Sequence, residues 1–181
     1  MIEKILFDEQ GLKPGTLYEK GQWKGIASHN EIEVKGFFGE YRFLSNSWPA
    51  KVFLDGDEYR STENAYQAAK YKKEERAHLQ QCTPRGAIVY VREHPMTAYT
   101  PDEWGNAKLN VMKELLVQKF DPALNSENHQ KLLDTGSRYL EETNYWGDIY
   151  WGINKSEASE AGEGQNNLGK LLMEIRGKYV L

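Results

Sequence analysis

Three polar residues at helical spacing are the first candidates for chemistry. After Ser61, the side chains of Glu63, Gln67 and Lys70 fall at relative helical angles of about 0°, 40° and −20°, which places them on one narrow stripe. If the stripe faces a cleft, it brings a carboxylate, an amide and an amine to one ligand. If it faces solvent, it is an ordinary polar face with a Glu/Lys pair, and the spacing leaves both interpretations open.

The aromatic segment from Trp146 to Gly152 is the second candidate, because it carries Asp148. A carboxylate among Trp and Tyr rings loses hydration, which favours its protonated, acid form. Trp151 and its neighbours could also stack on a flat nucleobase. The alternative is a turn whose aromatic side chains fill the core.

Two glycine-rich stretches carry groups suited to phosphate. Gly162 and Gly164 precede the predicted last helix, and free backbone N–H groups at a helix start favour an anion. The N–H groups from Gly164 to Asn167, with Asn166 between them, are therefore candidate phosphate ligands. The chain lacks the full Walker and dinucleotide-binding glycine patterns, so an ordinary loop is the alternative.

A second loop offers a guanidinium and two small polar side chains. Arg42, Ser45 and Asn46 could bind a phosphate or a ribose hydroxyl. The alternative for Ser and Asn is hydrogen bonding within the loop itself.

The histidines and the single cysteine indicate no metal site. His78 and Cys82 lie four residues apart, but two ligands do not make a site. The other three histidines have no partner at ligand spacing. Cys82 excludes an internal disulfide and is predicted to be a buried structural residue, and we expect neither metal nor cofactor.

Composition and charge narrow the class of protein. Five Trp, eleven Tyr and six Phe among 181 residues predict a folded globular chain. The 23 basic and 27 acidic residues give a net charge of −4, which argues against duplex binding driven by phosphate neutralisation. No apolar run approaches the ~18 residues of a membrane helix and no signal-peptide pattern follows Met1, so we expect a soluble cytoplasmic protein.

Local signals predict the elements that must position these residues. Asp55-Gly56 is typical of a hairpin turn, Ser61 or Thr62 can cap a helix, and Thr100-Pro101 with Glu103 is a strong helix start. The expected elements are a half-buried strand over 32–35, a hairpin over 52–60, a helix from 62 to about 73, a helical region over 74–91 broken near Pro84 and Gly86, a helix from 101 to about 120 with Leu109 on its apolar face, a short helix capped by Ser126, a strand over 139–141 and a last helix over 168–176.

These elements include no β-α-β-α alternation. They predict an α+β fold, as a mostly helical single domain with a small antiparallel sheet. Residues 1–35, which are rich in Gly and Pro punctuation, are predicted to be an N-terminal extension, and residues 36–181 the catalytic domain.

Six segments in this order resemble the YbiA-like family, also called the NADAR domain. They are Phe43–Asn46 with Trp48-Pro49; Ser61-Thr62-Glu63 with Gln67 and Lys70; Trp104 with Met112–Phe120; Thr135-Gly136 with Glu141; Asp148 with Trp151-Gly152; and Gly164 with Asn166–Gly169 and Leu172–Arg176. The resemblance covers about residues 36–176. The N-terminal extension and an insert-like loop over residues 154–163 depart from the family's pattern.

The resemblance implies a YbiA-like fold and an N-glycoside hydrolase that cleaves the bond between ribose C1′ and a base nitrogen. The implied substrates are phosphorylated: pyrimidine ribosylamine phosphates of riboflavin synthesis, or ADP-ribose attached to guanine, including guanine in DNA. The expected partner is a small N-ribosyl phosphate or ADP-ribosyl compound linked to NAD metabolism, and ADP-ribosylated nucleic acid is a further candidate. Carried over by position, Glu63, Trp104, Asp148 and Trp151 are the expected site residues, and Lys70 is our further candidate.

That chemistry gives each residue a role. Breaking a ribosyl C–N bond builds positive charge at C1′ and negative charge on the base, and glycosidases commonly divide these between two carboxyl groups. Glu63 and Asp148 are the predicted pair, with the acid and the stabiliser unassigned. Lys70 would orient the sugar phosphate or form a Schiff base with an opened ribose. Trp104 and Trp151 would stack on the base.

The remaining candidates bind substrate rather than react. Phosphate would lie on Arg42, on Ser45 and Asn46, or on the N–H groups from Gly164 to Asn167, and Gln67 would contact the ligand beside Glu63. The alternative function is a non-catalytic module that binds ADP-ribose or an NAD derivative in the same pocket. The two carboxylates favour an enzyme, because recognition of an anionic ligand gains nothing from added negative charge.

Overall fold

The computed structural model of the protein describes residues 7–8, 11–12, 28–156 and 159–179, and it divides into two compact units. One unit consists of residues 46–132. The other combines the described parts of residues 1–45 and 133–181. Most of the predicted N-terminal extension lies outside the described residues. The sequence did not predict the division, and each unit is described by itself.

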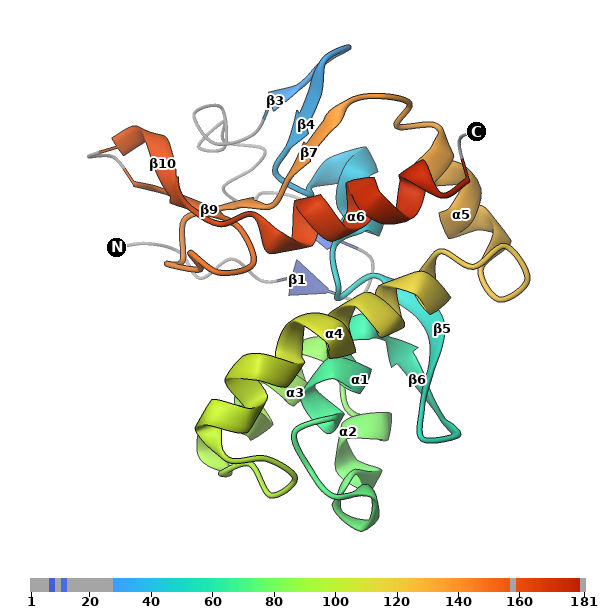
Figure 1. Ribbon diagram of the computed structural model, residues 1–181, viewed down its shortest axis with the longest axis vertical. Helices are drawn as coiled ribbons and strands as arrows, with labels where there is room; N and C mark the ends of the chain where they lie inside the picture. The colour runs from blue at the N-terminus through green and yellow to red at the C-terminus, as the bar shows by residue number, and fades with distance from the viewer. Residues whose placement is uncertain (1–6, 9–10, 13–27, 157–158, 180–181) are drawn as a thin grey trace. The chain divides into compact units, whose positions relative to one another are not determined.

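The unit of residues 46–132 begins with a hairpin and continues with helices (Figure 1). Its elements are β5 (Pro49–Leu54), β6 (Asp57–Ser61), α1 (Thr62–Ala68), the 3₁₀ helix η3 (Lys73–Glu75), α2 (Ala77–Gln81), α3 (Pro84–Glu93), α4 (Pro101–Lys119) and α5 (Ser126–Leu133, which ends one residue beyond the unit). The hairpin turns at Asp55 and Gly56, which have φ of 51° and 87°, so the predicted Asp-Gly turn is confirmed.

Two of the helix starts predicted in this unit are confirmed by their caps. Ser61 Oγ accepts the Asn64 N–H at 3.1 Å, which satisfies one of the first unpaired donors of α1. Thr100 and Glu103 form a complete capping box, in which the Glu103 carboxylate accepts the Thr100 N–H at 2.8 Å. These caps fix where α1 and α4 begin, and with them the positions of the predicted site residues on both helices.

Helix α4 packs against α1 and β5 within this unit (Figure 1). The small side chains of α1 and its C-terminal cap that are buried are those of Ala65, Ala68 and Ala69. On α4 the buried face holds Trp104, Met112, Leu115 and Leu116. Leu109, predicted to lie on that apolar face, is 37% exposed and does not belong to it.

Three boundaries in this unit differ from the prediction. The helix after Ser61 ends at Ala68 rather than near Lys73. The helical break falls before Pro84, which is the first residue of α3, and Gly86 lies inside that helix. Ser126 is the first residue of α5 rather than its cap.

The other unit contains most of the strands and the last helix. Its elements are β1 (Phe7–Asp8), β2 (Gly11–Leu12), β3 (Ser28–His29), β4 (Glu33–Lys35), the 3₁₀ helix η2 (Gly39–Leu44), β7 (Tyr139–Glu141), β8 (Thr143–Asn144), β9 (Ile153–Ser156), β10 (Ser159–Gly164) and α6 (Asn167–Gly177). Helix α6 packs against β7. Val34 and Leu140, on paired strands, are fully buried, whereas Ile32 just before β4 is 78% exposed.

The α+β class is confirmed, but the strands differ from the predicted single antiparallel sheet. They form small separate sheets, with strand orders β3-β4-β7, β10-β9-β8, β5-β6 and β1-β2. Strand β4 pairs with β7 in parallel, and β8 pairs with β9 in parallel. Parallel neighbours need a crossover connection rather than a hairpin, and β4 and β7 are about a hundred residues apart, so no local turn signal announces their pairing.

The insert-like loop predicted over residues 154–163 is a β-hairpin, made by β9 and β10. Gly162 and Gly164 lie in β10 with φ of 71° and 146°, values that glycine adopts without strain. A Cβ at Gly164 would overlap the backbone carbonyl of Gly152, so the glycine is required by close strand packing. Among the described residues, no helix is both long and apolar enough to span a membrane.

Gly152, beside the Asp148 segment, gives a first prediction. A Cβ there would overlap the Glu142 carbonyl oxygen and crowd the Asn144 side chain, so Gly152→Ala should destabilise the protein by about 1–3 kcal/mol. Gly105→Ala is the control, since its Cβ would meet nothing and the change should stabilise α4 by about 0.5–1 kcal/mol. Urea unfolding of both variants measures this difference, and equal stabilities would contradict it.

Candidate active site

Glu63, Gln67 and Lys70 form a continuous hydrogen-bonded chain in the unit of residues 46–132. Gln67 Nε2 donates to Glu63 Oε1 at 2.6 Å, and Lys70 Nζ donates to Gln67 Oε1 at 2.6 Å. The predicted stripe is therefore a connected row of carboxylate, amide and amine. Gln67 is 8% exposed, so the link between the two charged groups is shielded from water.

Aromatic rings border the amine of Lys70. Its Nζ lies 5.3 Å from the centroid of Tyr66 and 5.5 Å from the centroid of Trp104, distances at which a cation is attracted to a ring face. Tyr66 and Tyr99 contact Trp104, with centroid separations of 5.1 and 5.4 Å. Trp104 itself is buried, so the amine lies against a largely dry aromatic wall.

This environment changes the protonation of Lys70. Burial lowers the pKa of Lys70 below its ordinary value of 10.5, because a desolvated ammonium loses hydration. The Glu63 carboxylate opposes this effect, and the Lys108 cation adds to it. A lysine whose pKa is lowered by burial and by a neighbouring cation has the character of a nucleophilic amine.

Asn46 is tied to the first turn of α1. The Glu63 N–H donates to the Asn46 carbonyl at 2.9 Å, so the backbone of the predicted loop residue is joined to that of the carboxylate. The Asn46 side chain is 8% exposed, and its Oδ1 accepts no hydrogen bond from the described residues. A buried acceptor without a donor is costly, and a ligand hydroxyl is one group that can satisfy it.

Asp148, in the other unit, organises a tight turn. Its Oδ1 accepts the N–H groups of Tyr150 at 3.0 Å and Trp151 at 2.8 Å. The side chain of Asn144 hydrogen-bonds to both backbone groups of the same residue: its Oδ1 accepts the Asp148 N–H and its Nδ2 donates to the Asp148 carbonyl. The carboxylate is therefore half-buried and fixed through one oxygen, while Oδ2 has no hydrogen-bond partner among the described residues.

The rings around Asp148 divide between core and surface. Trp151 is half-buried and meets Tyr150 edge to face, with centroids 4.9 Å apart. Trp146 is 51% exposed, so it does not fill the core as the alternative interpretation expected. The segment is thus a fixed turn with exposed aromatic surface beside a carboxylate.

The predicted phosphate cradle of free N–H groups from Gly164 to Asn167 is wrong for residues 165–167, whose N–H groups are paired. The backbone N–H groups of residues 165–168 donate, in order, to the carbonyls of residues 149, 152, 150 and 151, at 2.8 to 3.4 Å. They hold the Asp148 turn in place instead of facing a ligand. Gly164 lies in β10, not in a loop before a helix.

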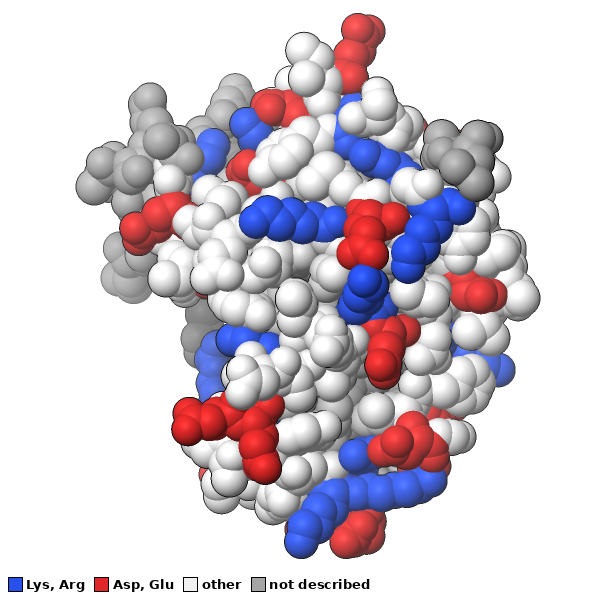
Figure 2. Space-filling model, in the orientation of Figure 1, with Lys and Arg blue, Asp and Glu red and all other residues white. Residues whose placement is uncertain are grey.

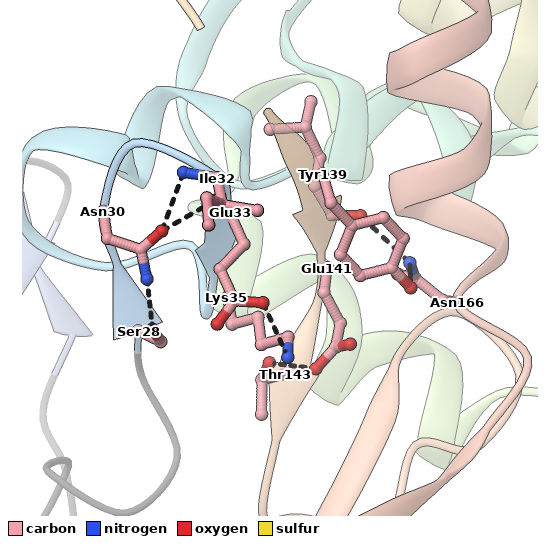
Figure 3. A network of polar contacts seen from close by, with 10 residues as sticks. Ser28, Asn30, Ile32, Glu33, Lys35, Tyr139, Glu141, Thr143 and Asn166 are labelled. Carbon is pink, nitrogen blue, oxygen red and sulfur yellow. Dashed lines mark hydrogen bonds and ion pairs between the residues drawn. The ribbon is translucent and has the colours of Figure 1, made fainter. Parts of the chain in front are cut away.

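Asn166 and Asn167 also support this turn through their side chains. Asn166 is 2% exposed, accepts the Glu142 N–H and donates to the Leu140 carbonyl and the Tyr139 hydroxyl. Figure 3 shows the Tyr139 contact beside the polar face of β4 and β7, where Lys35 pairs with Glu33 at 2.8 Å. Asn167 Nδ2 donates to the Tyr150 carbonyl at 2.9 Å. Both asparagines therefore have structural partners, and their predicted substrate contacts stay predictions.

The other candidate phosphate ligands lie at the end of η2. Arg42 lies in η2 and is only 6% exposed. Ser45 is half-buried, and its N–H donates to the Arg42 carbonyl at 3.0 Å. The contacts of both residues with phosphate stay predictions.

The predicted catalytic and stacking residues are divided between the two units. Glu63, Lys70 and Trp104 lie in the unit of residues 46–132, and Asp148 and Trp151 lie in the other. The predicted meeting of Glu63 and Asp148 around one anomeric carbon stays a prediction. Tyr66, which the sequence analysis missed, falls at a helical angle of about −60° from Glu63, close to Lys70, and that angle was the signal for it.

Comparison with known proteins identifies the family. The NADAR domain family matches residues 33–179. The chain belongs to the NADAR domain family. The resemblance predicted from the six sequence segments is confirmed.

Named relatives agree with this assignment. The N-glycosidase YbiA of Shigella boydii serotype 4 (strain Sb227) is 31% identical over 149 residues, covering 78% of this chain and 84% of that protein. The N-glycosidase YbiA of Escherichia coli (strain K12) is 32% identical over 147 residues, with the same shares covered. The NMR structure of the E. coli protein YbiA matches with a TM-score of 0.65 and 26% identity, covering 86% of this chain and 89% of that one. The YbiA-like α+β fold is confirmed by this match.

Metal ligands and the single cysteine were the other groups considered in the sequence. Among the described residues, no group of three or more His, Cys, Asp or Glu side chains is placed to hold a metal ion. Cys82 is half-buried rather than buried, and burial raises the pKa of its thiol, which disfavours the reactive thiolate. A cavity of about 420 Å³ beside α2 and α3, lined by His78, Arg85, Tyr90 and their neighbours, contains none of the predicted site residues.

Asp148 gives a second prediction, which separates its structural role from its chemistry. Asp148→Ala leaves the N–H groups of Tyr150 and Trp151 without their acceptor and should cost about 1–3 kcal/mol in stability. Asp148→Asn retains an Oδ1 acceptor and should stay within about 1 kcal/mol of the wild type. Urea unfolding measures both, and an alanine variant as stable as the asparagine variant would show that the turn does not depend on this side chain.

Proposed function

We propose that the chain hydrolyses the ribosyl C1′–N bond of a phosphorylated ribosyl or ADP-ribosyl nucleobase compound. The coarser part of the proposal, a hydrolase that acts on N-glycosidic bonds, is the class of its YbiA relatives within the NADAR family. The substrates we consider are ADP-ribosyl-guanine, including guanine in DNA, and the pyrimidine ribosylamine phosphates of riboflavin synthesis.

One observation supports the mechanism most directly. A carboxylate, an amide and a desolvated amine are linked by two 2.6 Å hydrogen bonds against the Trp104 ring. A non-catalytic ADP-ribose reader has no need of an amine whose pKa is lowered by burial, since a fully charged lysine binds an anion better. This arrangement therefore favours turnover over simple binding.

Glu63 is proposed to act at the sugar. As the C1′–N bond lengthens, positive charge grows on C1′ and the ring oxygen, and a carboxylate stabilises that charge. Gln67 holds the Glu63 carboxylate in one orientation through Oε1. Trp104 would stack on the base or the sugar and exclude water.

Lys70 is proposed to orient the sugar phosphate or, as an alternative to cleavage on the closed sugar ring, to act through an imine. In the opened form of an N-riboside, C1′ is doubly bonded to the base nitrogen. The Lys70 amine attacks C1′, the base leaves carrying the two amine protons, and a Lys70–C1′ imine remains. Water then adds to the imine, which releases the sugar aldehyde and returns the free amine. Every step uses only substrate, water and this side chain.

Asp148 and Asn46 are proposed to bind the substrate's polar groups. The two hydrogen bonds to the Asp148 carboxylate go to Oδ1, so Oδ2 is suited to accept a ribose hydroxyl or to share a proton with the base. Asn46 Oδ1 offers a second acceptor for a hydroxyl donor. Arg42, Ser45, Asn166 and Asn167 stay candidates for the phosphate, and Trp151 for stacking.

The surface supports a small substrate, or only local contact with a larger one. On the face shown in Figure 2, the described Lys and Arg side chains are interspersed with Asp and Glu rather than gathered into a basic field. With a net charge of −4, the chain has no general attraction for duplex phosphate. ADP-ribosylated nucleic acid therefore stays a proposed partner recognised at the modified base, and the cytoplasmic location stays a prediction.

A substrate panel tests the proposed function. The full chain is incubated with NAD, with ADP-ribosyl-guanine in an oligonucleotide and with an aminopyrimidine ribosylamine phosphate, and released base is followed by mass spectrometry. We expect one of the last two to lose its base catalytically. Stoichiometric binding of a panel member without base release would instead support the ADP-ribose-binding module.

A further inference from the structure

Lys70 lies two residues beyond the end of α1, and its N–H still donates to the Gln67 carbonyl in that helix at 3.3 Å. Helix α1 ends at Ala68, and in a longer helix the Lys70 carbonyl would accept the N–H of Glu74. Here that carbonyl accepts two other N–H groups, from Thr97 and Ala98, both at 3.1 Å. A segment 27 residues downstream thus holds the carbonyl side of the Lys70 backbone.

The same segment, residues 94–98, is joined to the chain just after Lys70. The Tyr71 hydroxyl donates to the His94 carbonyl at 2.8 Å, and Tyr71 is 2% exposed. The Lys72 N–H donates to Thr97 Oγ1 at 3.2 Å, and the same hydroxyl donates to the Glu75 carboxylate. With the two bonds to Lys70, five hydrogen bonds link residues 94–98 to residues 70–75.

The same segment is followed directly by residues that contact or carry Trp104. Tyr99 follows it and contacts Trp104, and Thr100 caps the helix that carries Trp104 in its first turn. Thr97 and Ala98 are therefore bonded to Lys70, and the next residue, Tyr99, contacts Trp104. The Lys70 amine lies 5.5 Å from the centroid of the Trp104 ring, so the two groups that this segment connects are neighbours.

We infer that Thr97 is a positioning residue for Lys70: its hydroxyl and its N–H hold the backbone after α1 so that the amine stays against Trp104. This inference rests on the proposed function, in which Lys70 attacks C1′. The hydroxyl accepts from Lys72 and donates to Glu75, so both of its hydrogen-bonding directions are used. Valine has nearly the same shape as threonine but can do neither.

The test compares Thr97→Val with Thr97→Ser, which keeps the hydroxyl. The reactivity of the Lys70 amine is measured in the full chain by competitive labelling with acetic anhydride across pH, read at the Lys70 peptide by mass spectrometry. The titratable groups that act on this amine are Glu63 from α1 and Lys108 from α4, and neither is altered. In Thr97→Val the Lys70 amine becomes better hydrated, which raises its pKa and leaves less of the amine neutral at pH 8. Labelling at pH 8 should therefore fall about threefold, whereas Thr97→Ser should stay near wild type.

Turnover gives the second measurement. With the panel substrate, Thr97→Val should lower kcat about 3–10-fold with little change in KM, because the reacting amine is misplaced while the binding groups remain. Thr83→Val is the matched control: it removes a threonine cap from α3, where Oγ1 accepts the Gly86 N–H at 3.1 Å, and should leave Lys70 labelling unchanged. Tyr71→Phe, which removes the bond to His94, should move labelling in the same direction as Thr97→Val.

The outcomes separate this inference from the proposed function. Unchanged Lys70 labelling in both Thr97→Val and Tyr71→Phe overturns the positioning role, whatever the activity. Altered labelling in both, with no base release by the wild type, supports the positioning and overturns only the reaction. Near-UV circular dichroism confirms that each variant is folded, and since Thr97 is exposed the valine variant is expected to fold.

Discussion

Glu63→Gln should reduce base release by about 10²- to 10⁴-fold with the fold unchanged. Glutamine keeps an oxygen that can accept the hydrogen bond from Gln67 Nε2, so the 2.6 Å contact can persist without the charge. The transition state then loses the carboxylate that stabilises positive charge at C1′. The measurement is the initial rate of base release from the panel substrate, together with kcat and KM.

A matched control separates local from general electrostatics. Glu74→Gln, on the exposed 3₁₀ helix η3 of the same unit, removes the same charge from the surface and should leave the rate within about twofold. If Glu63→Gln retained more than about a tenth of wild-type turnover, Glu63 would not be the carboxylate that acts at the sugar.

The paired-carboxylate prediction is tested by combining this variant with Asp148→Asn. Two groups acting on one transition state give non-additive losses in a double-mutant cycle, whereas independent sites give losses that multiply. Near-normal base release in both single variants would show that the pair does not carry out the reaction. Because Asp148→Asn keeps its turn acceptor, a loss of rate there would report on chemistry rather than folding.

The sequence predicted those features that arise from local chemistry. Ser61 and Thr100 cap helices because their side chains satisfy N–H groups three residues away, and this depends on nothing distant. The Asp55-Gly56 turn is equally local, since it needs only a backbone that tolerates positive φ. The pairing of Glu63 with Gln67 follows from the helical repeat, whereas Lys70 lies beyond the end of α1.

Features that depend on distant partners were not predictable in the same way. Helix α1 ends early because the Lys70 carbonyl accepts the N–H groups of Thr97 and Ala98. No signal in the sequence near Ala68 reveals these competing hydrogen bonds. The N–H groups from Gly164 to Asn167 were expected to be free for phosphate, because a helix start leaves such groups unpaired. Those of residues 165–167 are instead paired with the carbonyls of residues 149, 150 and 152, a contact between two segments that both look like loops in sequence.

The corrected contacts change how the Asp148 half of the site is understood. A carboxylate that also organises its own turn has less freedom to move during a reaction than the sequence alone implied. Asn144, missed by the sequence analysis, brackets Asp148 from both sides of its backbone and is fully buried. Its signal was weak, because Asn in a loop is far more often engaged in local turns. The turn thus holds one oxygen of Asp148 in a fixed position.

Lys70→Arg should abolish covalent trapping and reduce turnover by about 10³-fold or more if the reaction passes through an imine. Arginine keeps the positive charge beside Trp104 but is never deprotonated, so it cannot attack C1′. Borohydride added to wild type with substrate should leave a sugar adduct on the Lys70 peptide, detected by mass spectrometry, and no adduct on Lys70→Arg. If Lys70→Arg keeps near-normal turnover, the amine acts only through its charge.

The pH dependence supplies an independent test of the same amine. Only the neutral amine attacks, so the trapping rate should rise with pH and level off above the pKa of Lys70, which burial lowers below 10.5. Lys108→Gln removes a neighbouring cation that lowers this pKa further, so the rise should move to higher pH and the trapping rate at pH 7 should fall. A profile that stays in place in Lys108→Gln, or that moves to lower pH, would show that the titrating group is not Lys70.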